Sequence, residues 1–174
     1  MSTFSTREAA MKAVLECARE DEKIVLVSPD AMLAARAVPF KAEFPDRFIE
    51  VGIAEQAAVD IAAGLATTGL TPVVITYAGF LTMRACEMIR TFVAYPHLNV
   101  KLIGLNGGML GGRREGVPLQ FFEDLVILRS ILGVKRMTPA DGHQAYKAVR
   151  ALFREEGPVY LRLGSVREPE VFDD

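Results

Sequence analysis

Residues 51–65, VGIAEQAAVDIAAGL, decide how the rest of the chain is arranged. The segment reads as the end of a strand, a tight turn at Gly52 and a helix that begins near Ala54. Small apolar residues recur at helical spacing and predict one buried helix face. The residues of this face are Ala57, Ala58, Ile61, Ala62 and Leu65. Glu55, in the first turn, is the first candidate functional residue.

Two interpretations of Glu55 follow from its position. A carboxylate in the first turn faces the positive end of the helix dipole, so Glu55 can simply stabilise the helix start. Alternatively, Glu55 lies at the carboxyl end of a strand, where open α/β sheets bind their ligands. Spacing alone favours the first interpretation, because acidic residues are common in first helical turns.

Two longer segments carry a resemblance to a known family. Residues 45–74, PDRFIEVGIAEQAAVDIAAGLATTGLTPVV, and residues 76–90, TYAGFLTMRACEMIR, resemble the pyrimidine-binding domain of transketolases, which are thiamine-diphosphate enzymes. The similarity extends from about Thr6 to Leu163. Its core is the sequence GIAEQ, followed in order by YxxF and RACEMIR.

The resemblance implies a role for Glu55 that its position could not show. The carboxylate would hydrogen-bond ring nitrogen N1′ of the cofactor's aminopyrimidine and favour the imino tautomer, whose nitrogen takes the proton from thiazolium C2. This role needs a carboxyl group in an apolar pocket, where it can share a proton with the ring. Tyr77 and Phe80 would stack on the same ring, and Asp30 and Ile53 would also lie against the cofactor.

Most of these residues have a simpler interpretation. Asp30 follows an apolar strand, so it can be a turn-forming or capping residue. Tyr77 and Phe80 follow a strand and can belong to the core. Arg84 can hold a carboxylate or a neighbouring subunit, or it can face solvent. Arg7 matches a family arginine, and the alternative is an exposed arginine at a helix start.

The segment 106–120, NGGMLGGRREGVPLQ, is expected to form a glycine-rich loop. Gly107 and Gly112 have the spacing of a phosphate-binding P-loop, but Arg113 and Arg114 replace the Lys and Ser or Thr that it needs. Glycine-rich turns can still form anion nests, and a lid at the mouth of a site is the alternative.

The same loop departs from the family pattern. Leu119 stands where transketolases carry a histidine that helps to handle sugar hydroxyls, and Thr138 stands where many relatives have a phosphate-binding arginine. Arg7, Arg84 and Glu115 remain as candidates for substrate contact. Either the substrate differs from a typical sugar phosphate, or the chain binds thiamine diphosphate without normal turnover.

Composition limits the class of protein. The 174 residues are enough for one domain with a sizeable core, and 51% hydrophobic with 24% charged residues is ordinary globular usage. The net charge of −2 gives no electrostatic reason to expect nucleic acid or an anionic membrane as a partner. With two histidines and no clustered cysteines, we expect no metal site made by this chain alone.

The chain also suggests its compartment. A run without charged residues between Asp60 and Arg84 is long enough for a membrane span, but residues 64–72 interrupt it with glycine, threonine and proline. Cys17 and Cys86 are isolated, which suggests a reducing compartment. The polar N-terminus has no apolar region of a signal peptide, so we expect a cytoplasmic protein.

Apolar runs alternate with helical patterns along the chain. Strands are expected at 23–28, 48–51, 73–76, 100–105, 135–138 and 159–163. Helices are expected at 6–19 with Thr6 as the N-cap, from 54 to a cap at Gly69, and at 79–94, 121–132 and 142–156. This alternation predicts an α/β three-layer sandwich with a mostly parallel sheet. Residues 1–164 would form the pyrimidine-binding domain, and 165–174 a linker or tail.

The resemblance implies that the chain needs a partner. In the family, a separate domain supplies the Mg²⁺ ligands and a diphosphate-binding segment with a Gly-Asp-Gly motif, which this sequence lacks. We therefore expect a pyrimidine-binding subunit of a split transketolase-like enzyme, which transfers two-carbon ketol units of a small sugar and is inactive alone. Self-association is also expected, because the apolar helices around 54–68 and 79–95 offer more buried face than one sheet needs.

Two other classes of function remain open. One is a related thiamine enzyme, such as a deoxyxylulose-phosphate synthase or a 2-oxo-acid dehydrogenase of the β type, although RACEMIR and the missing histidine favour it less. The other is a non-catalytic assembly module that kept the fold and lost the chemistry, which Leu119 favours.

Overall fold

A computed structural model describes residues 3–109, 116–165 and 167–172. Its centre is a six-stranded sheet in the order β3-β2-β4-β5-β7-β6, and all neighbouring strands in it are parallel. These strands are β2 (Ile24–Ser28), β3 (Phe48–Glu50), β4 (Thr71–Tyr77), β5 (Lys101–Leu105), β6 (Lys135–Met137) and β7 (Val159–Arg162). A separate antiparallel pair joins β1 (Thr3–Ser5) to β8 (Arg167–Pro169). The predicted α/β fold with a mostly parallel sheet is confirmed.

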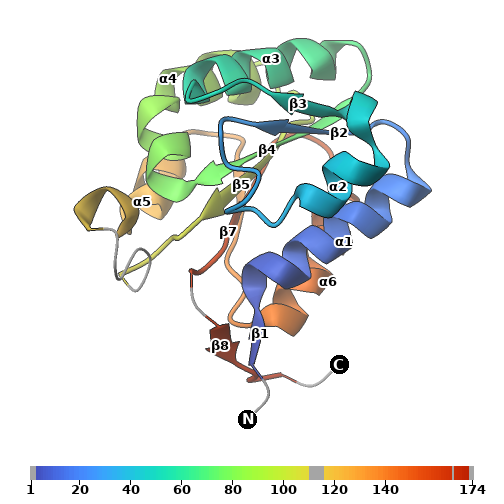
Figure 1. The fold of residues 1–174 in the computed structure, drawn as a ribbon. Helices are drawn as coiled ribbons and strands as arrows, with labels where there is room; N and C mark the ends of the chain where they lie inside the picture. Colours follow the sequence, from blue (N-terminus) through green and yellow to red (C-terminus); the bar gives the residue numbers. More distant parts are fainter. Residues whose placement is uncertain (1–2, 110–115, 166, 173–174) are drawn as a thin grey trace.

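Helices cover both faces of the central sheet and give the molecule three layers (Figure 1). One face packs against α1 (Thr6–Glu20), α6 (Gly142–Leu152) and the short α2 (Val38–Glu43). The other face packs against α3 (Glu55–Thr67), α5 (Asp124–Arg129) and the helical segment 80–94. Successive strand residues alternate between the two cores, as Val73 and Val74 of β4 do.

The helical segment between β4 and β5 is irregular. Phe80–Arg84 (η2) and Ile89–Ala94 (η3) are wound as π-helix, and the short α4 (Cys86–Met88) lies between them. The sequence predicts a single helix over 79–94. The helical character of this segment is confirmed, but its π winding was not predicted. Wide π turns are rare, and they frequently occur at functional sites.

Several predicted boundaries shift because individual residues have other partners. Ser5, not Thr6, takes the N-cap position of α1, and the Thr6 hydroxyl instead accepts a hydrogen bond from the Gly164 N–H at 3.2 Å. The helix expected at 121–132 begins only at Asp124, because Phe121 forms an isolated bridge with Gly107. Within the described residues, no helix is long and apolar enough to span a membrane.

The last described residues are tied to the domain. The backbone N–H groups of Val171 and Phe172 each donate to the Asp141 carboxylate at 2.9 Å. The same carboxylate caps α6 by accepting from the Gln144 N–H at 2.8 Å. Figure 1 shows the paired strands β1 and β8 side by side, away from the central sheet. The use of residues 165–174 as a linker or tail stays a prediction.

Lys101 and Tyr160 are the large side chains with a polar group that are fully buried in the described central strands. Lys101, at the start of β5, has no exposed area, and its Nζ donates to the backbone oxygens of Glu155 at 2.7 Å and Gly157 at 3.0 Å. Burial lowers the pKa of Lys101 to about 8. The Tyr160 hydroxyl donates to Asp124 at 2.6 Å, and burial together with that carboxylate raises the pKa of Tyr160 well above its usual value.

Substitution of Gly104 in β5 tests how the buried Tyr160 side chain is packed. A Cβ at Gly104 would overlap the Tyr160 hydroxyl, so Gly104→Ala should lower the free energy of unfolding by about 1–3 kcal/mol. In the control Gly64→Ala, on α3, the added Cβ meets no atom of the same chain within 4 Å, and the stability of the dilute, unassociated chain should be unchanged or slightly raised. Denaturant unfolding compares the variants. A Gly104→Ala protein as stable as the wild type would show that Tyr160 is packed differently.

Lys101 should make stability depend on pH. Its pKa is about 8 in the folded chain and returns toward 10.5 on unfolding, so the unfolded chain binds more protons between these values. The contribution of Lys101 to stability therefore rises with pH across this window. In urea unfolding, wild type should gain stability relative to Lys101→Met when the pH is raised from about 7.5 to about 10. A difference that stays constant would argue against a depressed pKa.

Candidate functional site

The carboxyl ends of the parallel strands meet at one edge of the sheet, where the strand order reverses. The chain runs from β2 to β3 on one side and then returns to β4 on the other side of β2. Such a switch point in an open α/β sheet leaves a crevice that binds ligands. The residues that follow β2, β3 and β4 at this edge therefore form the candidate site.

Glu50, at the end of β3, joins two turns at this edge. Its Oε1 accepts hydrogen bonds from the N–H groups of Asp30 at 2.6 Å and Gly52 at 3.1 Å, and its Oε2 accepts from the Ser28 hydroxyl at 2.9 Å. Asp30 and Gly52 both have positive φ, 50° and 70°, which glycine adopts readily and aspartate tolerates. The turn interpretation of Asp30 accounts for these contacts, and its cofactor contact stays a prediction.

Glu55 is the first residue of α3, and only 6% of its side chain is exposed. Its Oε1 lies 3.0 Å from Nη1 of Arg84 and forms an ion pair with it. An unpaired buried carboxylate would be costly, so Arg84 provides the counter-charge that stabilises this position. Stabilising a helix dipole does not require burial. The interpretation of Glu55 as a residue that only stabilises the helix start therefore does not explain why its side chain is buried.

Tyr77 is the last residue of β4, and Phe80 is the first residue of η2. Their ring centroids are 5.7 Å apart and their planes meet at 72°, an edge-to-face arrangement. The Arg84 guanidinium lies over the Phe80 ring, 3.9 Å from its centroid. Phe80 and Arg84 also line a cavity of about 520 Å³, together with residues of the segment 117–123. The structure therefore brings Glu55, Arg84 and the aromatic pair together.

A buried polar network, which the sequence pattern did not indicate, supports the wall of this cavity. Asp124 accepts from the Tyr160 hydroxyl and also pairs with Arg162 at 3.0 Å. Arg162 donates to the backbone oxygen of Phe121 at 3.4 Å, and Phe121 lines the cavity. A Cβ at Gly107 would overlap the Arg162 side chain. The sequence feature that could have indicated this network is the position of the charged residues 124 and 162, each in an apolar run.

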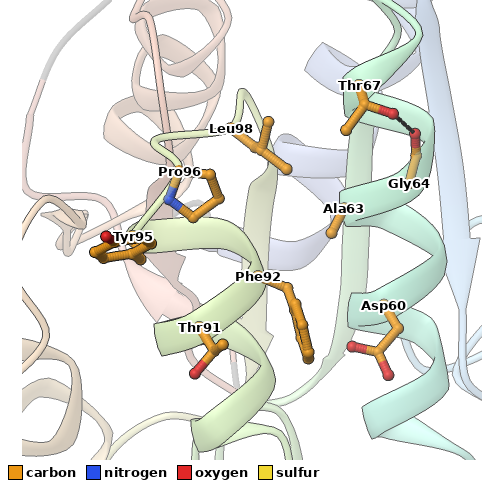
Figure 2. Close-up of a pocket in the computed structure, with 9 residues that line it drawn as sticks. All are labelled: Asp60, Ala63, Gly64, Thr67, Thr91, Phe92, Tyr95, Pro96 and Leu98. Atoms are coloured by element: carbon orange, nitrogen blue, oxygen red, sulfur yellow. Dashed lines mark hydrogen bonds between the residues drawn. The ribbon is translucent and has the colours of Figure 1, made fainter.

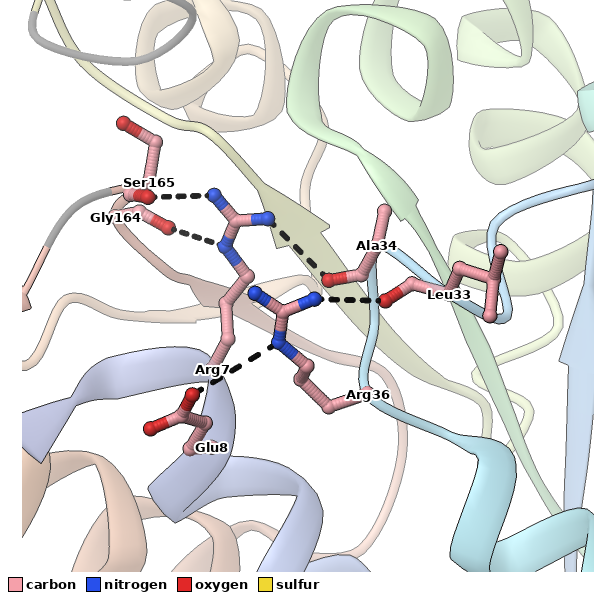
Figure 3. A network of polar contacts seen from close by, with 7 residues as sticks. All are labelled: Arg7, Glu8, Leu33, Ala34, Arg36, Gly164 and Ser165. Carbon is pink, nitrogen blue, oxygen red and sulfur yellow. Dashed lines mark hydrogen bonds and ion pairs between the residues drawn. The ribbon is translucent and has the colours of Figure 1, made fainter.

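Arg7 contacts backbone carbonyls (Figure 3). Its guanidinium donates to Gly164 at 3.1 Å, to Ser165 at 2.7 Å and to Ala34 at 3.3 Å. These bonds join the start of α1 to the loop after β2 and to the segment after β7. They give Arg7 a structural role, and its contact with a substrate stays a prediction.

The remaining predicted residues are mostly exposed or lie outside the described residues. Ile53 is 75% exposed in the turn before α3. Glu115 lies outside the described residues, and so does the part of the P-loop comparison that concerns residues 112–114. Leu119 ends the short 3₁₀ helix η4 (Val117–Leu119), and Thr138 is exposed after β6.

A second groove, of about 520 Å³, lies between α3 and η3 (Figure 2). Phe92 points from η3 into the groove toward α3, and Ala63 and Gly64 lie on the α3 side. Phe92 is 46% exposed and Tyr95, at the end of η3, is 90% exposed. The groove therefore lies between the helices for which the sequence predicts self-association.

Comparisons with known proteins identify the family to which the chain is similar. A family profile described as "Transketolase, pyrimidine binding domain" matches residues 2–165. The chain is 36% identical over 171 residues to an apulose-4-phosphate transketolase subunit of Phocaeicola vulgatus, with 98% of this chain and 54% of that protein covered. It is 34% identical over 165 residues to a 6-deoxy-6-sulfo-D-fructose transketolase subunit of Clostridium sp. (strain MSTE9), with 95% and 50% covered.

A solved structure gives the same result. A chain described as "Split gene transketolase, inactive beta4 tetramer" superposes with a TM-score of 0.87 at 39% identity, covering 99% of this chain and 55% of that chain. The present chain thus spans about half the length of the relatives that it matches. By its fold and its sequence, the chain belongs to the family of transketolase pyrimidine-binding domains.

Proposed function

We propose that this chain is the pyrimidine-binding subunit or domain of a transketolase-like enzyme, with residues 1–164 as that domain. The enzyme transfers two-carbon ketol units with thiamine diphosphate. The observation that carries the proposal is the buried carboxylate of Glu55 beside Arg84 and the aromatic pair, at the switch point of the sheet. Two similar proteins are named as subunits of transketolases.

The residues of the site suit the pyrimidine end of this cofactor. An aminopyrimidine is a flat ring whose nitrogen can share a proton with a carboxyl group, and Glu55 offers that group out of solvent. Tyr77 and Phe80 offer aromatic surface for stacking, and the cavity volume beside Phe80 is in the range of small-ligand sites. The family resemblance implies that Mg²⁺ and the diphosphate are bound by a partner, and this remains part of the proposal.

Each residue then has a defined task. Thiamine diphosphate, when bound here, would supply the nucleophilic carbon that ketol transfer needs. Glu55 holds a proton at the ring nitrogen of the pyrimidine and is shielded from competing water. Phe80 and Tyr77 fix the plane of the ring relative to this carboxylate. Asp30 and Ile53, in the two turns at this edge, complete the proposed cofactor contacts.

The proposed substrate is a small sugar or sugar derivative. The similar proteins are named for apulose 4-phosphate and 6-deoxy-6-sulfo-D-fructose, so the proposal does not extend to one particular sugar. Arg7, Arg84 and Glu115 are the candidates on this chain for substrate contact. Leu119 cannot transfer a proton, and other groups must handle the sugar hydroxyls.

A non-catalytic assembly role is the second candidate function. It is favoured by Leu119, an apolar residue where the family pattern has a histidine. In that case the chain would bind its partner without contributing to turnover. Substitution of Glu55 separates the two candidates, because only the catalytic function requires its proton.

Glu55→Gln should lower ketol transfer by at least about 100-fold when the chain is assayed with a diphosphate-binding transketolase subunit, because general acid–base groups contribute about 10²–10⁴ in rate. The matched control is Glu87→Gln, an exposed acid on α4, which should leave the rate unchanged. Thermal unfolding checks that both variants fold. Full activity of Glu55→Gln would refute the catalytic role, and no activity of the wild-type pair would favour the assembly role.

We further propose that the chain self-associates through the groove between α3 and η3. Exposed aromatic side chains beside small residues can pack against a second copy, and they are otherwise unfavourable in water. The similar solved structure is described as a tetramer. The enzyme as a whole would then contain several copies of this chain together with its partner.

Phe92→Asp should weaken this self-association, because it places a charge in the apolar groove. Sedimentation velocity should show a shift toward smaller species relative to the wild type. The control is Val126→Asp, which changes an exposed residue of α5, 71% exposed, outside the groove. A wild-type chain that is monomeric throughout, or equal association by all three proteins, would exclude this surface.

A further inference from the structure

Arg84 contacts both groups on which the proposed pyrimidine site depends. Its Nη1 lies 3.0 Å from Oε1 of Glu55, and its guanidinium carbon lies 3.9 Å from the centroid of the Phe80 ring. Because one guanidinium reaches both, the carboxylate and this face of Phe80 border the same space. A flat ring that is bonded to Glu55 and stacked on this face would need the space that the guanidinium now fills.

The two members of this ion pair differ in their freedom to move. Glu55 is buried at the start of α3, shortly after a turn that Glu50 fixes through the Gly52 N–H. Arg84 is 49% exposed and ends the π-helical turn η2. Within the described part of the chain, its guanidinium has no hydrogen bond other than the one to Glu55. Arg84 can therefore swing into solvent, whereas Glu55 stays in place.

We infer that Arg84 is a guard of the pyrimidine site. In the chain without cofactor it neutralises Glu55 and covers the face of Phe80, and it leaves both when an aminopyrimidine ring enters. The inference rests on the proposed function and adds a positioning residue that controls access to the carboxylate. It also gives Arg84 a role other than substrate contact or solvent exposure.

The guard lowers the affinity of the free chain for a pyrimidine. A protein that is competent to bind for only a fraction of the time has an apparent dissociation constant raised by the inverse of that fraction. If Arg84 covers the site for most of the time, its removal should tighten binding by about threefold to tenfold. The same removal should destabilise the free chain, because Glu55 is left buried without its partner.

The test is a titration of the full 174-residue chain with 4-amino-5-hydroxymethyl-2-methylpyrimidine. This probe lacks the diphosphate and so does not require the partner. The change in NMR chemical shift with probe concentration compares wild type with Arg84→Met, which keeps an aliphatic side chain and removes the guanidinium. Arg90→Met, at an exposed arginine of η3, is the matched control.

Arg84→Met should bind the probe about threefold to tenfold more tightly than wild type, and Arg90→Met should match wild type. Equal or weaker binding by Arg84→Met, with clear binding by wild type, overturns the guard and leaves the proposed function standing. No binding by any of the three proteins counts against the proposed function and overturns the guard with it.

A second readout needs no ligand. The denaturation midpoints of wild type, Glu55→Gln, Arg84→Met and the double variant form a double-mutant cycle. The fall in midpoint caused by Arg84→Met should be smaller in the Glu55→Gln background, because no carboxylate charge is left unpaired. Additive effects would show that the two side chains are not coupled, and the guard would then be rejected.

Discussion

The ion pair between Glu55 and Arg84 is the interaction on which the candidate site depends. It allows a carboxylate to remain at the start of α3 with almost no contact with water. Neither residue could reach the other through local structure, because they follow different strands that lie on opposite sides of β2. The reversal of strand order at this point therefore brings a buried acid, a cation and an aromatic pair into one crevice.

The surrounding structure holds these groups in place. Glu50 fixes the turns before α3 and after β2 with a single carboxylate. The backbone that leads to Glu55 is therefore held at the strand ends and is not a free loop. On the other side, the buried contacts of Asp124 with Tyr160 and Arg162 set the wall of the cavity. Functional side chains are more precisely placed when rigid elements and supporting hydrogen bonds hold them.

The sequence predicted the fold from features that are local. Apolar runs and helical spacing placed all six strands of the central sheet, and the resemblance named Glu55, Tyr77 and Phe80 as one site, which the structure brings together around Arg84. The π winding of 80–94 and the partners of Glu50 arise from tertiary packing, which spacing does not encode. Arg7 illustrates the same limit, since its partners lie in segments far from it in sequence.

A crystal structure of this chain with a diphosphate-binding transketolase subunit and thiamine diphosphate would test the central claim most directly. We predict a carboxylate oxygen of Glu55 at about 2.7–3.2 Å from a nitrogen of the pyrimidine ring, with Phe80 against the ring and Arg84 displaced from both. A Glu55 that still pairs with Arg84, while the pyrimidine ring binds elsewhere, would contradict the role assigned to this carboxylate.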